Sequence, residues 1–297
     1  MKVIKLLELL RPKQWIKNLF IFAPLLFAGE LLHFEILFKS IIAFFAFCGT
    51  SSIVYIINDI LDKEADKVHK EKKYRPIASG EISISEALIF AIGILVITIL
   101  LSSTQNFYFW IVLVIYFVLN ILYSLWVKHI VILDVFFISA GFMLRVIGGA
   151  VAIWVPLSSW MILTTIFISL FLAISKRRAE LVQVDEENIE IQRKVLFHYD
   201  TIFLDQMNTI AATGTIICYA LYTVSEKAIK TFHTENLIYT TPFVIYGIFR
   251  YLYLIHIKKL GENPANILTR DIPLIINAIL WFIISVLIIY NSKSLIW

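Results

Sequence analysis

The sequence is poor in the features that mark most soluble enzymes. Its two cysteines, Cys48 and Cys218, both lie in apolar stretches, so no disulfide framework is implied. No dinucleotide-binding, phosphate-loop, zinc-protease or serine-hydrolase motif occurs, and the spacing of the six histidines argues against zinc. A formal net charge of +4 is too small to indicate nucleic-acid binding. No proline-, glycine- or serine-rich linker divides the chain, which predicts a single domain over residues 1–297.

Apolar residues dominate instead. They make up 60% of the 297 residues, and the mean hydropathy is +0.83, whereas soluble proteins are roughly 45 to 50% apolar. A membrane-spanning helix needs about 20 mostly apolar residues. Nine such windows lie near 18–33, 38–58, 83–102, 107–126, 130–153, 157–175, 205–225, 236–257 and 273–292. The sequence therefore predicts an all-α polytopic membrane protein with about nine transmembrane helices.

Basic residues are distributed unevenly between the two sides of this topology. With the N-terminus in the cytoplasm, twenty Lys and Arg residues fall in cytoplasmic segments and four, at positions 39, 227, 230 and 293, fall outside. Because cytoplasmic loops collect basic residues, we expect a cell-membrane protein with its N-terminus inside and its C-terminus outside. No cleavage site follows the basic N-terminal residues, so we expect a retained cytoplasmic arm.

The most informative polar residues follow the second predicted span. Asn58, Asp59, Asp62 and Asp66 come without a glycine or proline break, so we expect the helix to continue through them. Residues three and four apart share a helix face, which would present one amide and three carboxylates at the cytoplasmic interface. Stacked like charges favour a bound hard cation, and Mg²⁺ is the usual one when phosphates complete its shell. The alternative is a solvated acidic helix end.

Basic residues near this acidic face are the second feature. Lys72, Lys73 and Arg75 follow it, and such cations bind phosphate oxygens that a metal leaves free. The positive-inside rule alone also predicts basic residues here, so only their adjacency to the carboxylates adds weight. Arg145 and Arg250 lie within predicted spans, where a cation normally faces a cavity or a partner; snorkelling explains Arg250 equally well. Further candidates for anion binding at cytoplasmic span ends are Lys17, Lys128, Lys176 and Arg177.

These residues resemble a known signature. The segment from Asn58 to Asp66, followed by Arg75-Pro-Ile-Ala-Ser-Gly80, is similar to the first acidic motif of the UbiA-type intramembrane prenyltransferase superfamily. From about residue 9 to 290 the chain resembles the decaprenyl-phosphate phosphoribosyltransferase branch of that superfamily. The matching segments are Arg11 to Asn18, Val54-Tyr55, Lys128-His129, Leu144-Arg145 with Gly148-Gly149, Lys176-Arg177 with Glu180-Leu181, and Phe249-Arg250-Tyr251. The resemblance implies a cavity that opens to the cytoplasm and to lipid.

The second site departs from the common superfamily pattern. Most members carry another aspartate-rich motif after the sixth span, whereas this chain has Lys176, Arg177 and only Glu180. A cationic site suits a phosphate better than a second magnesium cluster. The resemblance therefore implies transfer of 5-phosphoribosyl from 5-phosphoribosyl-1-diphosphate to a polyprenyl phosphate, with Mg²⁺ as the cofactor and a role in cell-wall biosynthesis.

Residue roles follow from this hypothesis. Asn58, Asp59, Asp62 and Asp66 would hold Mg²⁺ against the donor's diphosphate, and the three aspartates are the candidate catalytic residues. The candidate substrate-binding residues are Lys17, Asn18, Tyr55, Lys72, Lys73, Arg75, Lys128, Arg145, Lys176, Arg177, Glu180 and Arg250. Two alternatives stay open, an ordinary UbiA-type prenyltransferase and a membrane transporter. The sequence also leaves open the isoprenoid length, the downstream glycan and the oligomeric state, a homo-oligomer included.

Overall fold

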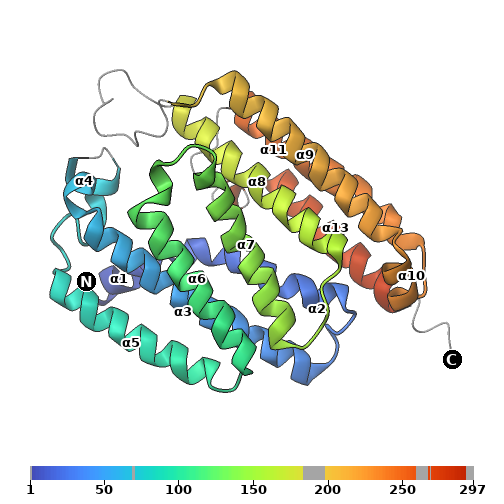
Figure 1. The fold of residues 1–297 in the computed structure, drawn as a ribbon, viewed down its shortest axis with the longest axis horizontal. Helices are drawn as coiled ribbons and strands as arrows, with labels where there is room; N and C mark the ends of the chain where they lie inside the picture. Colours follow the sequence, from blue (N-terminus) through green and yellow to red (C-terminus); the bar gives the residue numbers. More distant parts are fainter. Residues whose placement is uncertain (1, 69–70, 183–197, 259–266, 268, 292–297) are drawn as a thin grey trace.

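All regular secondary structure in the described part of the chain is helical (Figure 1). The computed structural model describes residues 2–68, 71–182, 198–258, 267 and 269–291. Within these residues every regular element is an α-helix or a 3-10 helix and none is a strand, which confirms the predicted all-α fold. The elements are α1 (Lys2–Leu9), η1 (Pro12–Phe22), α2 (Ala23–Phe27), α3 (Phe34–Leu61), α4 (Lys63–Val68), η2 (Lys72–Tyr74), α5 (Ile84–Ser102), α6 (Phe107–Leu125), η3 (Val127–His129), α7 (Leu133–Ala152), α8 (Ser159–Val182), α9 (Thr201–Thr223), α10 (Glu226–Phe232), η6 (Asn236–Thr240), α11 (Thr241–His256) and α13 (Ile272–Asn291).

The predicted count of nine spans is not confirmed. In the described residues seven segments are long and apolar enough to cross a membrane: α3, α5, α6, α7, α8, η6 with α11, and α13. The pair α9 and α10, bent by 50°, is an eighth if it counts as one span. The predicted span at 18–33 is divided between η1, α2 and the non-helical residues 28–33. Pro24 in the first turn of α2 lacks a backbone N–H, and Gly29 has a φ of 69°, which explains why no single helix runs through this segment.

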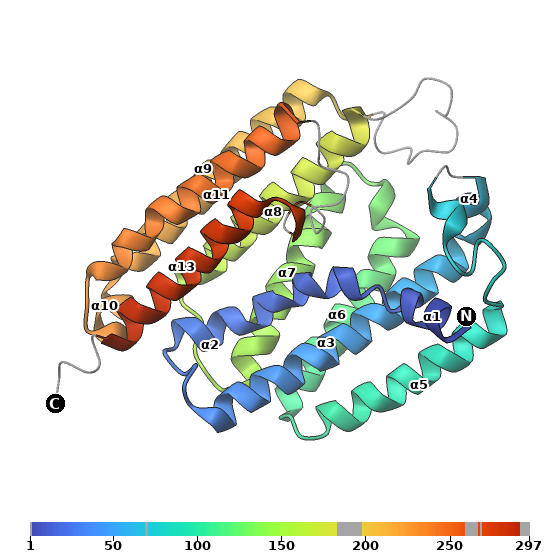
Figure 2. The ribbon, with the colours of Figure 1, turned by 180° about the vertical axis from the view of Figure 1, so that it is seen from behind.

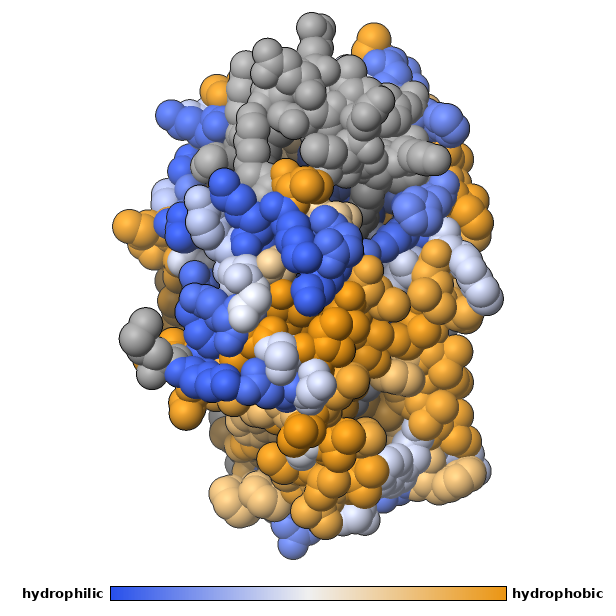
Figure 3. Space-filling model, turned by 90° about the vertical axis from the view of Figure 1, so that its left-hand side faces the viewer, coloured by the Kyte–Doolittle hydropathy of each residue, from blue (hydrophilic) through white to orange (hydrophobic). Residues whose placement is uncertain are grey.

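The outer helices expose apolar side chains instead of burying them. The most apolar window of α5 has a mean hydropathy of 2.6, yet only 17% of it is buried, and α13 has the same buried share at a hydropathy of 2.7. On the face shown in Figure 3, a broad apolar area lies below a region of hydrophilic side chains. A helix with apolar side chains on its exposed face is stable when hydrocarbon surrounds it. The chain is therefore a multi-pass membrane protein.

Helix α7 is the central element of the first half of the chain, because it contacts η1, α3, α6 and α8. Helix α8 also packs along α9, and α3 packs along α5 (Figures 1 and 2). Two glycines of α7 permit the close contacts. A Cβ atom on Gly149 would lie 2.1 Å from the carbonyl oxygen of Ile21 in η1, and one on Gly148 would lie 2.6 Å from the ring of Phe47 in α3. The absence of these two side chains therefore sets how closely η1 and α3 approach α7.

One end of the bundle collects residues that are far apart in the sequence. The C-terminal ends of α3 and α8 lie on the same side of the molecule, the left in Figure 1 and the right in Figure 2, and the first turn of α9 lies beside the end of α8. Asp59 lies near the end of α3, Lys176 near the end of α8 and Asp205 near the start of α9. The fold therefore brings the predicted acidic and cationic sites to the same end of the molecule.

Candidate active site

A cavity of about 220 Å³ lies between η1, α3, α6, α7 and α8. Three cations line it: Lys17 from η1, Arg145 from α7 and Lys176 from α8. The uncharged polar residues of its lining are Ser51, Tyr55, Asn58, Tyr116, Asn120 and Tyr123. Within the described part of the chain, none of the lining residues carries a carboxylate. Three cations together with hydroxyl and amide groups suit an anion with several oxygen atoms, such as a phosphate.

Lys17 shows how strongly positive this cavity is. It lies outside every candidate span in the described residues. The pKa of its ammonium group is lowered to about 8, mainly by burial and to a smaller extent by the guanidinium groups of Arg145 and then Arg11. A bound phosphate would oppose the repulsion by supplying negative charge. The lowered pKa therefore reflects the burial of the ammonium group first and the neighbouring positive charge second, and an anion would balance that charge.

The acidic helix face predicted from the sequence is interrupted at one residue. Helix α3 ends at Leu61, Asp62 forms a turn, and α4 begins at Lys63, so the prediction of an uninterrupted helix is wrong at Asp62. Aspartate favours such helix ends because its side chain competes for backbone groups. The spacing is nevertheless kept, since the Asp62 N–H donates to the Asn58 carbonyl and the Asp66 N–H donates to the Asp62 carbonyl, both at 2.8 Å.

Two of the predicted metal ligands are buried against arginines. Asp59 is 2% exposed and accepts hydrogen bonds from Arg11 and, at 3.1 Å, from Arg75 Nη1. Asp66 is 3% exposed and accepts from the same Arg75 nitrogen at 2.6 Å. Among the residues that the structure describes, no three His, Cys, Asp or Glu side chains group closely enough to hold a metal ion. Arg11 and Arg75 thus neutralise the carboxylates of Asp59 and Asp66, which were predicted from the sequence to bind a metal cation.

Asn58 and Asp62 keep oxygen atoms that a cation can use. Asn58 lines the cavity, and its buried Oδ1 atom has no hydrogen-bond partner in the described structure. The Asp62 side chain is 41% exposed, and its Oδ1 atom accepts a hydrogen bond from Lys128 Nζ at 3.1 Å. A buried acceptor without a donor is costly, and a bound cation would remove that cost. An amide oxygen one turn from a carboxylate fits a hard cation that takes further ligands from diphosphate oxygens.

Arg145 is a buried cation held by uncharged groups. It is 6% exposed and donates from Nε to Asn18 Oδ1 (2.7 Å), from Nη1 to the Gly141 carbonyl (2.8 Å) and from Nη2 to the Tyr116 hydroxyl (2.7 Å). Its guanidinium carbon also lies 4.8 Å from the centre of the Tyr116 ring. These contacts orient the guanidinium and leave its charge uncompensated. This geometry would suit Arg145, in the wall of the cavity, to the binding of an anion.

Comparison with known proteins identifies the family. The model of the UbiA prenyltransferase family matches residues 19–268. The chain belongs to this family. It is 35% identical over 291 residues to decaprenyl-phosphate phosphoribosyltransferase from Mycolicibacterium smegmatis, with 93% of this chain and 89% of the relative covered. It is 32% identical over 288 residues to the protein of that name from Mycobacterium tuberculosis, with 94% and 92% covered. Its fold matches a UbiA homologue from Archaeoglobus fulgidus, solved with GPP and Mg²⁺, with a TM-score of 0.71, 19% identity, and 96% of this chain and 99% of that chain covered.

In this UbiA-family chain the second site is divided between the faces of α8, because successive helical residues are rotated by about 100°. Lys176 lines the cavity and lies 3.6 Å from Glu180. Arg177 is fully buried, pairs with Asp134 and Glu180, and donates to the Tyr123 hydroxyl at 2.7 Å. Of the predicted cationic pair, Lys176 therefore lines the cavity, whereas Arg177 ties α8 to α7 and α6.

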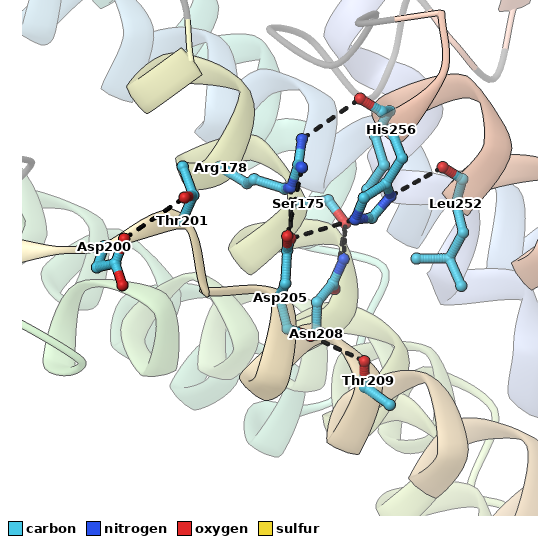
Figure 4. Close-up of polar contacts among 10 residues, drawn as sticks. Ser175, Arg178, Asp200, Thr201, Asp205, Asn208, Thr209, Leu252 and His256 are labelled. Atoms are coloured by element: carbon cyan, nitrogen blue, oxygen red, sulfur yellow. Dashed lines mark hydrogen bonds and ion pairs between the residues drawn. The ribbon is translucent and has the colours of Figure 1, made fainter. Parts of the chain in front are cut away.

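Arg178, the next residue of this UbiA-family chain, belongs to a third cluster, at the start of α9 (Figure 4). Its guanidinium pairs with the Asp205 carboxylate, and His256 Nε2 lies 3.2 Å from Oδ1 of the same carboxylate. His256 Nδ1 lies 3.0 Å from the Leu252 carbonyl oxygen. Both of these oxygens are acceptors when Asp205 is ionised, so the two hydrogen bonds form together only when the ring carries both protons. The cluster joins α8, α9 and α11 and turns Arg178 away from the cavity.

Of the twelve predicted substrate-binding residues, four line the cavity: Lys17, Tyr55, Arg145 and Lys176. The other eight are not among its lining residues: Asn18, Lys72, Lys73, Arg75, Lys128, Arg177, Glu180 and Arg250. Lys72 and Lys73 lie in η2, and the Lys73 ammonium group lies 5.1 Å from the centre of the Tyr74 ring. Arg250 forms two hydrogen bonds with Asp271, from Nε at 3.1 Å and from Nη2 at 2.8 Å. These bonds hold the pKa of Asp271, which precedes α13, below its ordinary value. The Arg250 charge is therefore compensated at the junction of α11 and α13.

Sequence reasoning missed three polar residues of α6. Tyr116, Asn120 and Tyr123 all line the cavity, and their spacing of four and three residues places them on one helix face. An asparagine within a membrane-spanning segment is by itself a functional signal, so this face could have been found from the sequence. Asp134 was missed as well, but nothing in its local sequence indicates that it pairs with Arg177, 43 residues away.

Proposed function

We propose that this chain transfers the 5-phosphoribosyl group from 5-phosphoribosyl-1-diphosphate to a polyprenyl phosphate and releases diphosphate. The observation that carries the proposal is the cavity, which Lys17, Arg145 and Lys176 line without any carboxylate among its described lining residues. Both substrates and both products are phosphates, so a cationic cavity suits each of them. The mycobacterial relatives with this activity in their name, at 35% and 32% identity over nearly the whole chain, support the same reaction.

The reaction needs no nucleophile from the protein. A phosphomonoester is largely a dianion at neutral pH because its second pKa is about 6. One oxygen of the lipid phosphate attacks C1 of the ribose, the bond from C1 to the diphosphate oxygen breaks, and its electron pair leaves with the diphosphate. Direct displacement inverts the configuration at C1. The task of the protein is to bring two anions together and to offset their repulsion.

The residues of the cavity can share this task. Lys17, Arg145 and Lys176 would bind the phosphates and reduce the repulsion between them. Asn58 and Asp62 would hold Mg²⁺, which when bound neutralises charge on the departing diphosphate.

The remaining acidic residues have a different role in this proposal. Asp59 and Asp66 would keep Arg11 and Arg75 beside the metal site, where both guanidinium groups can donate to phosphate oxygens. Asp59 and Asp66, which were predicted from the sequence as metal ligands, would thus act through the arginines that they bind.

The two rival functions have less support. Ordinary UbiA-type prenyl transfer with metal at both motifs requires carboxylates where Lys176 lines the cavity. A transporter tends to place its binding site near the bilayer midplane, whereas Asp59 and Lys176 lie towards one end of this bundle. We further propose that this end faces the cytoplasm in the cell membrane, because the cytoplasmic segments hold the large majority of the basic residues.

The decisive experiment uses the purified protein in detergent with a polyprenyl phosphate and 5-phosphoribosyl-1-diphosphate labelled in the ribose, with Mg²⁺ or with excess EDTA. We expect label to enter the organic phase only with Mg²⁺. Asp62→Asn should lower the rate by roughly 100-fold or more, while Asp200→Asn, the same change at an exposed residue before α9, should not.

Two outcomes would contradict the proposal. Label that stays in the aqueous phase, while a prenyl diphosphate is consumed with an aromatic acceptor, would refute phosphoribosyl transfer. Activity that persists in excess EDTA would remove the metal from the reaction. Binding of Mn²⁺ to wild type and Asp62→Asn, measured by electron paramagnetic resonance, tests the metal site without turnover.

A further inference from the structure

Asn18 occupies an unusual place beside the cavity. It is 1% exposed, and it is not among the residues that line the cavity, although Lys17 on one side of it is. Its Oδ1 atom accepts from Arg145 Nε at 2.7 Å. Its Nδ2 atom donates to Cys48 Sγ at 3.1 Å and to Ser51 Oγ at 3.5 Å. Both ends of the amide are therefore used within the protein, and neither is left for a substrate.

The chemistry of Arg145 fixes the orientation of this amide. A guanidinium group only donates hydrogen bonds, so the atom of Asn18 that faces it must be the carbonyl oxygen. The NH₂ group then points to Cys48 and Ser51 on α3. Asn18 thus links η1 to α3 and α7 at once, and it holds the Nε edge of Arg145.

The neutrality of this contact is the second observation. A carboxylate would be the usual partner of a buried arginine, because it compensates the charge. Arg145 instead contacts an amide, a backbone carbonyl and a phenol hydroxyl, all uncharged. Tyr116 and Phe142 add ring contacts at 4.8 and 5.2 Å. An aspartate at position 18 would have nearly the same shape and would cancel the charge.

We infer that Asn18 is a positioning residue that orients Arg145 toward a bound phosphate while leaving its positive charge uncompensated. This inference rests on the proposed function for the identity of the phosphate. Asn18 acts through Arg145 and does not touch the substrate. An asparagine serves this purpose because it accepts a hydrogen bond as aspartate does and adds no negative charge.

Binding of inorganic diphosphate, measured by calorimetry in EDTA, isolates the cationic cavity from the metal site. Asn18→Ala removes the orienting bond and should weaken diphosphate binding roughly 10- to 150-fold. Asn18→Asp keeps the shape and should weaken it more than Asn18→Ala does, because it compensates Arg145. Asn106→Ala is the matched control. Asn106 lies at the N-terminal end of α6, where its side chain donates to the Val151 carbonyl, so this substitution should leave diphosphate affinity unchanged.

A double-mutant cycle separates positioning from direct contact. If Asn18 acts through Arg145, Asn18→Ala should cost nothing further in an Arg145→Ala background, and KM for the phosphate that Arg145 binds should rise more than kcat falls. If Arg145→Ala does not fold, Arg145→Lys replaces it, because lysine has no Nε donor for Asn18. Additive losses, or an Asn18→Asp variant that binds diphosphate at least as well as Asn18→Ala, would overturn the inference. Wild type that binds diphosphate without transferring phosphoribosyl would refute the proposed function and leave this inference standing.

Discussion

Gly149 offers the sharpest test of how the cavity is assembled. A Cβ atom at this position would lie 2.1 Å from the carbonyl oxygen of Ile21, whereas ordinary van der Waals contact begins at 3.4 Å, so η1 must move by about 1.3 Å. The obstacle is backbone and cannot rotate away. Asn18 lies one turn from Ile21, and a shift of that size would stretch its 2.7 Å bond to Arg145 beyond hydrogen-bond length.

The expected cost of Gly149→Ala has two parts. Forcing an extra methyl group into a packed contact costs about 1 to 3 kcal/mol of stability. Loss of a hydrogen bond to a charged group costs about 1.5 to 3 kcal/mol, which corresponds to a loss of roughly 10- to 150-fold in kcat/KM. Thermal unfolding in detergent measures the first part, and transfer of labelled phosphoribosyl to lipid measures the second.

Gly93 provides the matched control. A Cβ atom on this residue of α5 would meet nothing within 4 Å. Gly93→Ala should therefore keep full activity, and it should gain about 0.5 to 1 kcal/mol because alanine favours the helix. A Gly149→Ala variant as stable and as active as Gly93→Ala would refute the argument that this close contact positions η1.

Three further outcomes are expected. Because the pKa of Lys17 is lowered to about 8, kcat/KM should fall above pH 8 as Lys17 loses its proton, and Lys17→Arg should move that fall to higher pH; identical pH profiles would exclude Lys17 from binding. Lys176→Ala should lower kcat/KM roughly 10- to 150-fold, and Lys176→Asp should be worse, since it places a carboxylate in the cavity; the reverse order would favour a second metal site. A reporter fused after residue 297 should be extracytoplasmic, and a cytoplasmic signal would contradict the predicted orientation.

Hydropathy predicted the long helices well because the physical signal is local. The window at 83–102 corresponds to α5 (Ile84–Ser102), and that at 273–292 corresponds to α13 (Ile272–Asn291). Each of these helices meets lipid along most of its length, so almost every residue in it must be apolar. The segment at 18–33 failed for a reason that is also local, since Pro24 and Gly29 interrupt an otherwise apolar window.

The sequence predicted which site residues lie close together only where the periodicity of a single helix determines it. Asn58 and Asp62 share a face because they are four residues apart, and this holds through the turn at Asp62. The pairing of Asp59 with Arg11 joins residues 48 positions apart, and no periodicity within one helix predicts it. For the same reason the sequence could not tell which of Lys176 and Arg177 lines the cavity, because the direction of each side chain depends on how α8 is rotated against its neighbours.

The partner of Arg250 could not be predicted from the sequence either. Its place within a predicted span indicated a buried cation that seeks a partner, but the partner, Asp271, precedes a different helix. Residue type and depth predict that such a cation needs an anion. Only the packing of α11 against α13 tells whether that anion is a substrate or a carboxylate of the protein.

The divergent directions of Lys176, Arg177 and Arg178 make the length of α8 as important as its composition. Deleting one residue earlier in the helix, with its first turns still packed, would rotate all three by about 100°. Arg177 would then take the place in the cavity and Arg178 would meet Asp134, so two of the three cationic positions would still hold a cation. Asp205 alone would lose its arginine. A substitution of one of these three cations therefore acts first on the contacts of that residue, whereas a change of helix length would alter the contacts of all three together.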